Sequence, residues 1–221
     1  MGWKQANYEE VRDNMQPGDV IAFSGKGDFS EIIKWATKSG VSHVGVILQA
    51  KLLVDNQPQA GYFNQIIEST SLNGFSGVTI SRLSDRFVNY DGEIWWLPLS
   101  KTVREKMDLK KFYDFLLHQE HKPYDMHQAV FAGLDVFDKI PFAEKLSRNI
   151  EDFSRFFCSE LVAAGLEESG GIPRVNASEV TPVDLCMFSI YQEDYYQIKG
   201  DAKTIKGYNS VTIADWGTDN P

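Results

Sequence analysis

Apolar and polar residues follow different spacings in the two halves of the chain. In the first half, short runs rich in apolar and β-branched residues are typical of strands. These strands are expected at 20–23, 41–48, 62–70, 78–83 and 93–99. A helical stretch at 8–15 and a turn at 16–19 come before them. A helix that interrupts them begins near Asp28, which with Glu31 has the spacing of a capping box.

The second half has the spacing of helices. Apolar side chains at 109, 112, 113 and 116 fall at i, i+3, i+4 and i+7 and therefore share one helix face. Further helices are expected at 125–137, at 158–168 and, after a cap at Thr181, at 182–191. An edge strand is expected around 211–213, and the tail at 217–221 is expected to fray. Strands followed by helices predict an α+β fold.

Length and charge narrow the classes of function. The 221 residues, 43% of them hydrophobic, fit a single domain over 1–221, with an inserted helical segment near 129–153. The 22 basic and 31 acidic residues give a net charge of −9, which disfavours nucleic acid and anionic membranes as partners. The chain shows no signal peptide and no apolar run of membrane-spanning length. We expect a soluble protein, cytoplasmic by default, with export of a longer precursor left open.

Cys158 is the first candidate for chemistry. It stands where a predicted helix begins, so its thiol faces the positive end of the helix dipole. That position favours the nucleophilic thiolate, and the nearby N–H groups are able to hold an oxyanion. The alternative is a buried cysteine packed as a small hydrophobe. The other cysteine, Cys186, is expected to be a core thiol.

His43 and Glu68 are candidates for the base and for the group that orients it. His43 lies in an apolar strand, and Glu68 lies in the next strand candidate along the chain. If these strands pair, Glu68 reaches one ring nitrogen of His43 and fixes its tautomer. In that role Glu68→Gln is expected to fold normally. A satisfied core histidine and a solvated carboxylate are the alternatives.

Several short motifs occur together in a specific order. They are Pro17-Gly18-Asp19-Val20, Ser42-His43-Val44-Gly45, Glu68, Pro123-Tyr124-Asp125, Cys158-Ser159-Glu160-Leu161 and Thr181-Pro182-Val183-Asp184-Leu185. This order resembles the circularly permuted branch of the NlpC/P60 superfamily, and most of all its YiiX-type group, in which the histidine precedes the cysteine. The resemblance implies a papain-like fold, with an antiparallel sheet or partial barrel packed against helices.

The same resemblance implies a set of roles. Cys158 would be the nucleophile, His43 the base and Glu68 the orienting acid, while Tyr124 and Ser159 would bind substrate or an oxyanion. The expected function is that of a cysteine peptidase or amidase that cleaves amide bonds between amino acids, in a peptide or cell-wall fragment, through a thioacyl intermediate. An acyltransferase or thioesterase acting on lipid-like acyl groups and a non-catalytic binding module remain alternatives.

No cofactor is expected, and the partner is a small-molecule or peptide substrate. A metal site formed by His118, His121, His127 and Asp125 is geometrically conceivable because His118 and His121 have i, i+3 spacing. The pattern is not that of a zinc-binding H-E-x-x-H helix, so no metal is expected. The sequence leaves the oligomeric state open.

Overall fold

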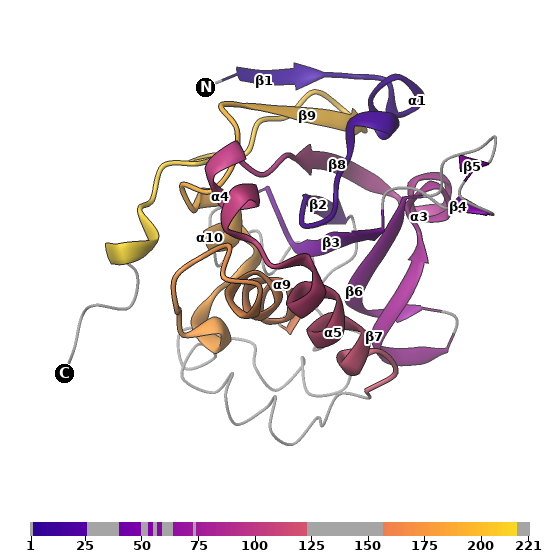
Figure 1. The fold of residues 1–221 in the computed structure, drawn as a ribbon. Helices are drawn as coiled ribbons and strands as arrows, with labels where there is room; N and C mark the ends of the chain where they lie inside the picture. Colours follow the sequence, from indigo (N-terminus) through magenta and orange to yellow (C-terminus); the bar gives the residue numbers. More distant parts are fainter. Residues whose placement is uncertain are drawn as a thin grey trace, which may run out of the picture.

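A seven-stranded sheet lies at the centre of the computed structural model, which describes residues 2–25, 40–49, 53–54, 57–58, 64–72, 74–122 and 157–215. Its strands are β1 (Gly2–Gln5), β2 (Val20–Gly25), β3 (His43–Gln49), β6 (Gln65–Leu72), β7 (Phe75–Arg82), β8 (Gly92–Leu97) and β9 (Asp194–Lys199). The spatial order is β1-β9-β8-β2-β3-β6-β7 (Figure 1). Neighbouring strands are antiparallel except for the parallel pair β1–β9. A separate pair joins β4 (Leu53–Val54) to β5 (Gln57–Pro58).

Helices cover the sheet. They are α1 (Tyr8–Val11), α3 (Leu83–Asn89), α4 (Lys101–Lys106), α5 (Leu109–Gln119), α9 (Phe157–Glu168) and α10 (Pro182–Met187). Short 3-10 turns lie at Arg12–Asn14, Ala177–Glu179 and Ile213–Asp215. Helix α9 packs against β3 and β6 and also contacts α5 and α10 (Figure 1). Helix α3 packs against β7.

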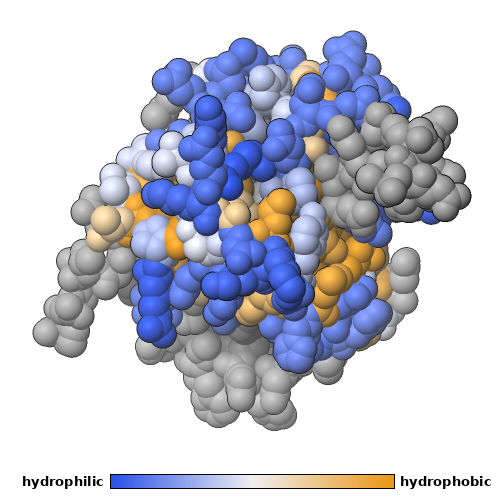
Figure 2. All heavy atoms as spheres, in the orientation of Figure 1, coloured by the Kyte–Doolittle hydropathy of each residue, from blue (hydrophilic) through white to orange (hydrophobic). Residues whose placement is uncertain are grey.

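Each face of the sheet has its own apolar core, because successive strand residues point to opposite faces. We call the α9 side the helix-side cluster; it includes Val20, Ala22, Val44, Val46, Ile67, Cys158, Val162 and Leu166. The opposite cluster contains Tyr8, Met15, Ile21, Phe23, Ile47, Ile66, Leu83, Ile94, Trp96 and Ile198. In Figure 2 the viewed surface is mostly hydrophilic, with apolar residues visible beside the β6–β7 pair.

The turn before β2 is fixed by a glycine and a buried acid. Gly18 has φ 88°, a left-handed conformation that favours glycine, and a Cβ there would approach Leu99 and Met107 side-chain atoms to 2.9 Å. Asp19 is fully buried. Its carboxylate accepts hydrogen bonds from Leu99 N (2.8 Å), Gln16 N (2.8 Å) and Trp96 Nε1 (3.0 Å), and it pairs with Arg104. The acid therefore joins the start of β2 to the end of β8 and to α4.

The α+β class is confirmed, as are the five expected strands, the helix after Asp108 and the helix that carries Cys158. The expected C-terminal edge strand is wrong: Val211 makes an isolated bridge to Phe188 and a 3-10 turn follows. The strands missed from sequence are the two-residue strands β4 and β5 and the strands β1 and β9, the last two of which pair across more than 190 positions. Helix α10 ends at Met187, short of the expected 191.

The expected helix at 8–15 divides into α1 and a 3-10 turn. The expected helices after Asp28 and at 125–137, the inserted segment near 129–153 and the tail at 217–221 lie outside the described residues.

Candidate functional site

His43 and Glu68 lie side by side on the neighbouring strands β3 and β6. Strands β3 and β6 pair with Val46 opposite Ile67 and Ile47 opposite Ile66. His43 Nε2 lies 2.7 Å from Glu68 Oε2, and the two side chains are 3% and 0% exposed. The contact expected from strand pairing is therefore present. Because Nε2 is engaged by the carboxylate, a thiol proton would have to be taken by Nδ1.

Gly45 on β3 lies beside Glu68 on β6, where a larger residue would crowd it. A Cβ at Gly45 would come within 2.6 Å of Ile66 Cδ1 and 3.1 Å of Glu68 Cβ. The 2.6 Å contact would force the Ile66 side chain to move, and the 3.1 Å contact would press on Glu68 itself. The glycine two residues after His43 therefore permits the close packing of β3 on β6 that carries the His43–Glu68 contact.

Arg86 is the third member of this buried group, and sequence reasoning missed it. Its Nε lies 2.6 Å from Glu68 Oε1, and its Nη2 donates to Glu68 Oε2 at 3.1 Å. The guanidinium carbon is 5.5 Å from the ring centroids of both Phe23 and Tyr90. One signal pointed to it: Arg86 is three residues after the buried Leu83, so both occupy the inward face of a short helix.

The charge state of Glu68 follows from these contacts. Burial acts to raise the pKa of Glu68, but the Arg86 charge and the hydrogen bond with His43 oppose it, and the net pKa is lowered. Glu68 is therefore an ionised carboxylate inside the protein. An ionised acid beside one ring nitrogen fixes the imidazole tautomer, which is what an orienting residue requires.

Cys158 lies in the first turn of α9, the helix that packs against β3 and β6. Its side chain is fully buried, in the helix-side cluster with Val44. The His43 ring instead packs 5.3 Å from Phe23, a member of the opposite cluster. Since His43 is the first residue of β3, a Cys158–His43 pair has to form at the end of the sheet, where the chain enters that strand.

The remaining predicted site residues have different placements. The Ser159 hydroxyl donates to Val180 O at 2.5 Å, so its single proton ties α9 to the segment before α10; a role in binding substrate stays a prediction. Tyr124 lies outside the described residues. Cys186 is buried in α10, as expected for a core thiol, and burial raises its pKa.

The alternative metal site loses its geometric basis in the described residues. Helix α5 ends at Gln119, and His121 lies beyond it with φ 62°, so His118 and His121 do not share a helix face. His127 and Asp125 lie outside the described residues. In the described part of the chain, no three His, Cys, Asp or Glu residues gather in a group able to hold a metal ion.

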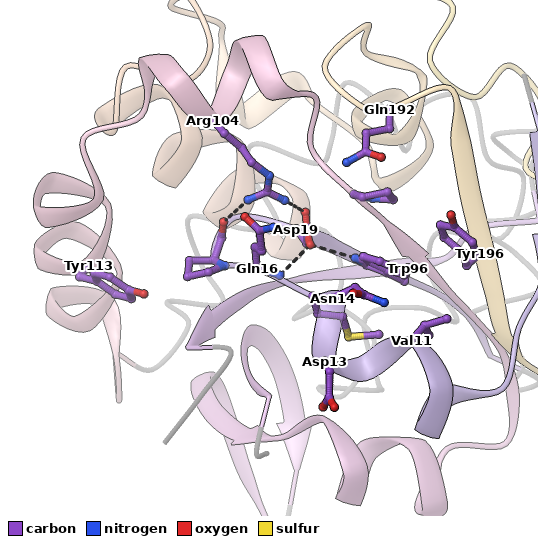
Figure 3. Close-up of a pocket in the computed structure, with 13 residues that line it drawn as sticks. Val11, Asp13, Asn14, Gln16, Asp19, Trp96, Arg104, Tyr113, Gln192 and Tyr196 are labelled. Atoms are coloured by element: carbon purple, nitrogen blue, oxygen red, sulfur yellow. Dashed lines mark hydrogen bonds and ion pairs between the residues drawn. The ribbon is translucent and has the colours of Figure 1, made fainter. Parts of the chain in front are cut away.

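A second polar feature surrounds Asp19. A cavity of about 720 Å³ has Asp19, Arg104, Trp96, Tyr113 and Tyr196 among its lining residues. Figure 3 shows Arg104, Gln16 and Trp96 converging on Asp19. Asp19 is four residues before Phe23, the register partner of His43, so the cavity lies roughly 13 Å along the sheet from the His43 site. Each Asp19 oxygen already accepts two donors, which makes this ion pair structural.

No protein-family model and no curated protein matches the chain. Among solved structures it is similar to the crystal structure of metalloprotein YiiX from Escherichia coli O157:H7, with 19% sequence identity and a TM-score of 0.44. The match covers 72% of this chain and 68% of the other. Within the described residues, no helix combines the length and apolar character that crossing a membrane requires.

Proposed function

We propose that this protein is a cysteine hydrolase that cleaves amide bonds between amino acids, in a peptide or a cell-wall fragment. Cys158 is the nucleophile, His43 the general base and Glu68 the group that orients it. The observation that carries the proposal is the buried 2.7 Å contact between His43 Nε2 and Glu68 Oε2, on strands packed against the helix whose first turn holds Cys158. The circularly permuted, papain-like fold belongs to the same proposal.

The reaction divides into acylation and deacylation. In acylation, His43 Nδ1 accepts the Cys158 proton while the sulfur attacks the substrate carbonyl carbon. The tetrahedral intermediate collapses, the C–N bond breaks, and the amine leaves with the proton from His43. The acyl group stays on sulfur as a thioester.

In deacylation, His43 takes a proton from water, and the resulting hydroxide attacks the thioester carbonyl. The C–S bond breaks, the acid product leaves, and the proton returns to the thiolate. N–H groups at the start of α9 are suited to bind the oxyanion in both steps, because the helix dipole is positive there. Glu68 holds the imidazole and stabilises it when it is protonated.

The experiment compares kcat/KM on a short aminoacyl amide with that on a long-chain acyl ester. Cys158→Ala serves as the blank, and Cys186→Ala is the matched control because it removes the other buried thiol. Turnover of the amide by the wild type and by Cys186→Ala, with loss in Cys158→Ala, is the expected result.

Two other outcomes contradict the proposal in different ways. A clear preference for the long-chain ester would assign the same residues to an acyltransferase or thioesterase. Turnover of neither substrate, together with an absence of labelling of Cys158 by acyl-amide and acyl-ester activity probes, would favour a non-catalytic binding module.

A further inference from the structure

The buried His43–Glu68 pair has a fixed cation beside it. For His43 to act as a base it must be neutral, so it cannot supply the positive charge that keeps Glu68 ionised before the thiol proton moves. In the described part of the chain, the side chains that contact Glu68 and are able to carry a positive charge are His43 and Arg86. Arginine stays protonated throughout the working pH range of proteins. Arg86 is therefore the permanent counterion of Glu68.

We propose that Arg86 is a positioning residue of this site, which keeps the Glu68 carboxylate ionised and in place so that Glu68 can hold His43 with Nδ1 turned to the thiol. The effect of Arg86 on catalysis rests on the proposed hydrolase function. Its effect on the charge of Glu68 concerns the protein without substrate and does not depend on that function. Both Glu68 oxygens contact the guanidinium, at 2.6 Å from Nε and 3.1 Å from Nη2. The Nη2–Oε2 contact is a charge-assisted hydrogen bond and the Nε–Oε1 contact is a close ion pair, so the guanidinium holds the carboxylate both by direction and by charge.

Arg86 is itself held in place from several sides. The rings of Phe23 and Tyr90 lie against the guanidinium, and Arg86 is 11% exposed. The end of α3 is fixed by Lys199 of β9, whose Nζ donates to Phe87 O, to Val88 O at 3.3 Å and to Tyr90 O at 2.7 Å. Because the cation is organised before any substrate arrives, Glu68 needs no rearrangement to remain ionised.

Other charged groups near the pair have different partners or positions. Strand β2 carries no titratable side chain. On β7, Arg82 is exposed at the end of the strand, opposite Gln65. On β8, Glu93 pairs with Lys203 at 3.8 Å. Helix α9 contributes the Cys158 thiol and Glu160, whose pKa is raised by burial. Arg86 is thus the group whose removal should change the protonation of Glu68 most directly.

The test follows Glu68 itself in the full chain. The carboxyl carbon of Glu68 is titrated by NMR on protein with ¹³C-labelled glutamate, and its signal is assigned by its loss in Glu68→Gln. In Arg86→Gln, burial acts without the guanidinium, so the proton affinity of Glu68 should rise by about tenfold or more. Arg86→Lys should restore most of the wild-type titration. Arg82→Gln removes an exposed charge four residues away and should leave Glu68 unchanged.

Activity is read in the same variants as the pH profile of kcat/KM on the aminoacyl amide. The acid limb of Arg86→Gln should move to higher pH with the Glu68 titration, and Arg86→Lys should return it. The proposal is overturned if the Glu68 titration in Arg86→Gln is the same as in the wild type. It is also overturned if that titration shifts while the acid limb of the kcat/KM profile of an active Arg86→Gln enzyme does not move. Failure of the hydrolase function is recognised separately, by a wild type that turns nothing over, and the Glu68 titration then still decides the electrostatic role.

Should Arg86→Gln fail to fold, Arg86→Gln/Glu68→Gln decides the outcome. Uncharged side chains then replace both members of the pair, so neither member leaves a buried charge without its counterion. Recovered folding supports the view that the ionised Glu68 requires Arg86. An unfolded double variant overturns an electrostatic role in favour of packing.

Discussion

Glu68→Gln should weaken the fold as well as the proposed chemistry, contrary to the sequence-based expectation that it folds normally. Glu68 is fully buried and contacts Arg86, which is 11% exposed. Gln removes the negative charge, so the guanidinium stays buried without its counterion. The amide NH₂ group cannot accept a hydrogen bond, so His43 or Arg86 also loses an acceptor. Breaking one partner of a buried ion pair costs about 3–5 kcal/mol, and we expect a loss in that range at pH 7.

The stability difference between wild type and Glu68→Gln should depend on pH in a definite direction. Because the pKa of Glu68 is lowered in the folded protein, its contribution to stability is fully present above the unfolded value near 4.5. That contribution is lost as pH falls through the folded pKa. The difference in unfolding free energy between wild type and Glu68→Gln should therefore be largest near neutral pH and shrink in acid.

Urea unfolding at pH 7 and at a series of pH values from about 5 down to about 3 measures the difference. Glu105→Gln is the matched control: Glu105 is 63% exposed and lies 3.7 Å from Lys101, so its loss should change stability by no more than about 0.5 kcal/mol. A destabilisation of Glu68→Gln below about 1 kcal/mol at pH 7 would refute the view that the buried pair depends on this charge. A difference that does not shrink in acid would refute the assigned pKa direction.

Three further predictions test the surroundings of the site. Gly45→Ala should destabilise the protein by about 1–3 kcal/mol in urea unfolding, because the new Cβ would lie 2.6 Å from Ile66 Cδ1. An unchanged stability would contradict the tight packing of β3 on β6. Asp19→Asn should lower the free energy of unfolding by about 3 kcal/mol, because Arg104 and one buried N–H group lose their acceptor. The control Asp13→Asn changes a side chain that is 52% exposed and should leave stability nearly unchanged. Equal effects of the two substitutions would exclude the structural role of Asp19. Iodoacetamide at pH 6 should label Cys158 faster than Cys186, because burial raises the pKa of the Cys186 thiol. Peptide mass spectrometry measures the two labelling rates. Preferential labelling of Cys186 would count against Cys158 as the nucleophile.

Local patterns were enough to locate most of the central elements. Runs of apolar and β-branched residues identified β2, β3, β6, β7 and β8. The signal is plainest in β2, where every residue is buried. Helical spacing located α5, and the cap at Thr181 located the start of α10. The candidate residues Cys158, His43 and Glu68 were likewise chosen from their residue types and their places on predicted elements.

Contacts between distant segments needed the tertiary structure. Strands β1 and β9 are short and pair with each other from opposite ends of the chain, so no local pattern marks their pairing. In the sequence alone, Arg86 is one of several charged residues on a short helix. The tertiary structure packs α3 against the sheet, and the guanidinium then contacts Glu68 between the rings of Phe23 and Tyr90. Gly45 reads as a weak point in a strand until Glu68 occupies the space beside it. The sequence by itself determined where most of the central elements lie and which side chains carry reactive groups. Only the tertiary structure decided the charge state of Glu68, because that state depends on a burial and a counterion supplied by segments far apart in the chain.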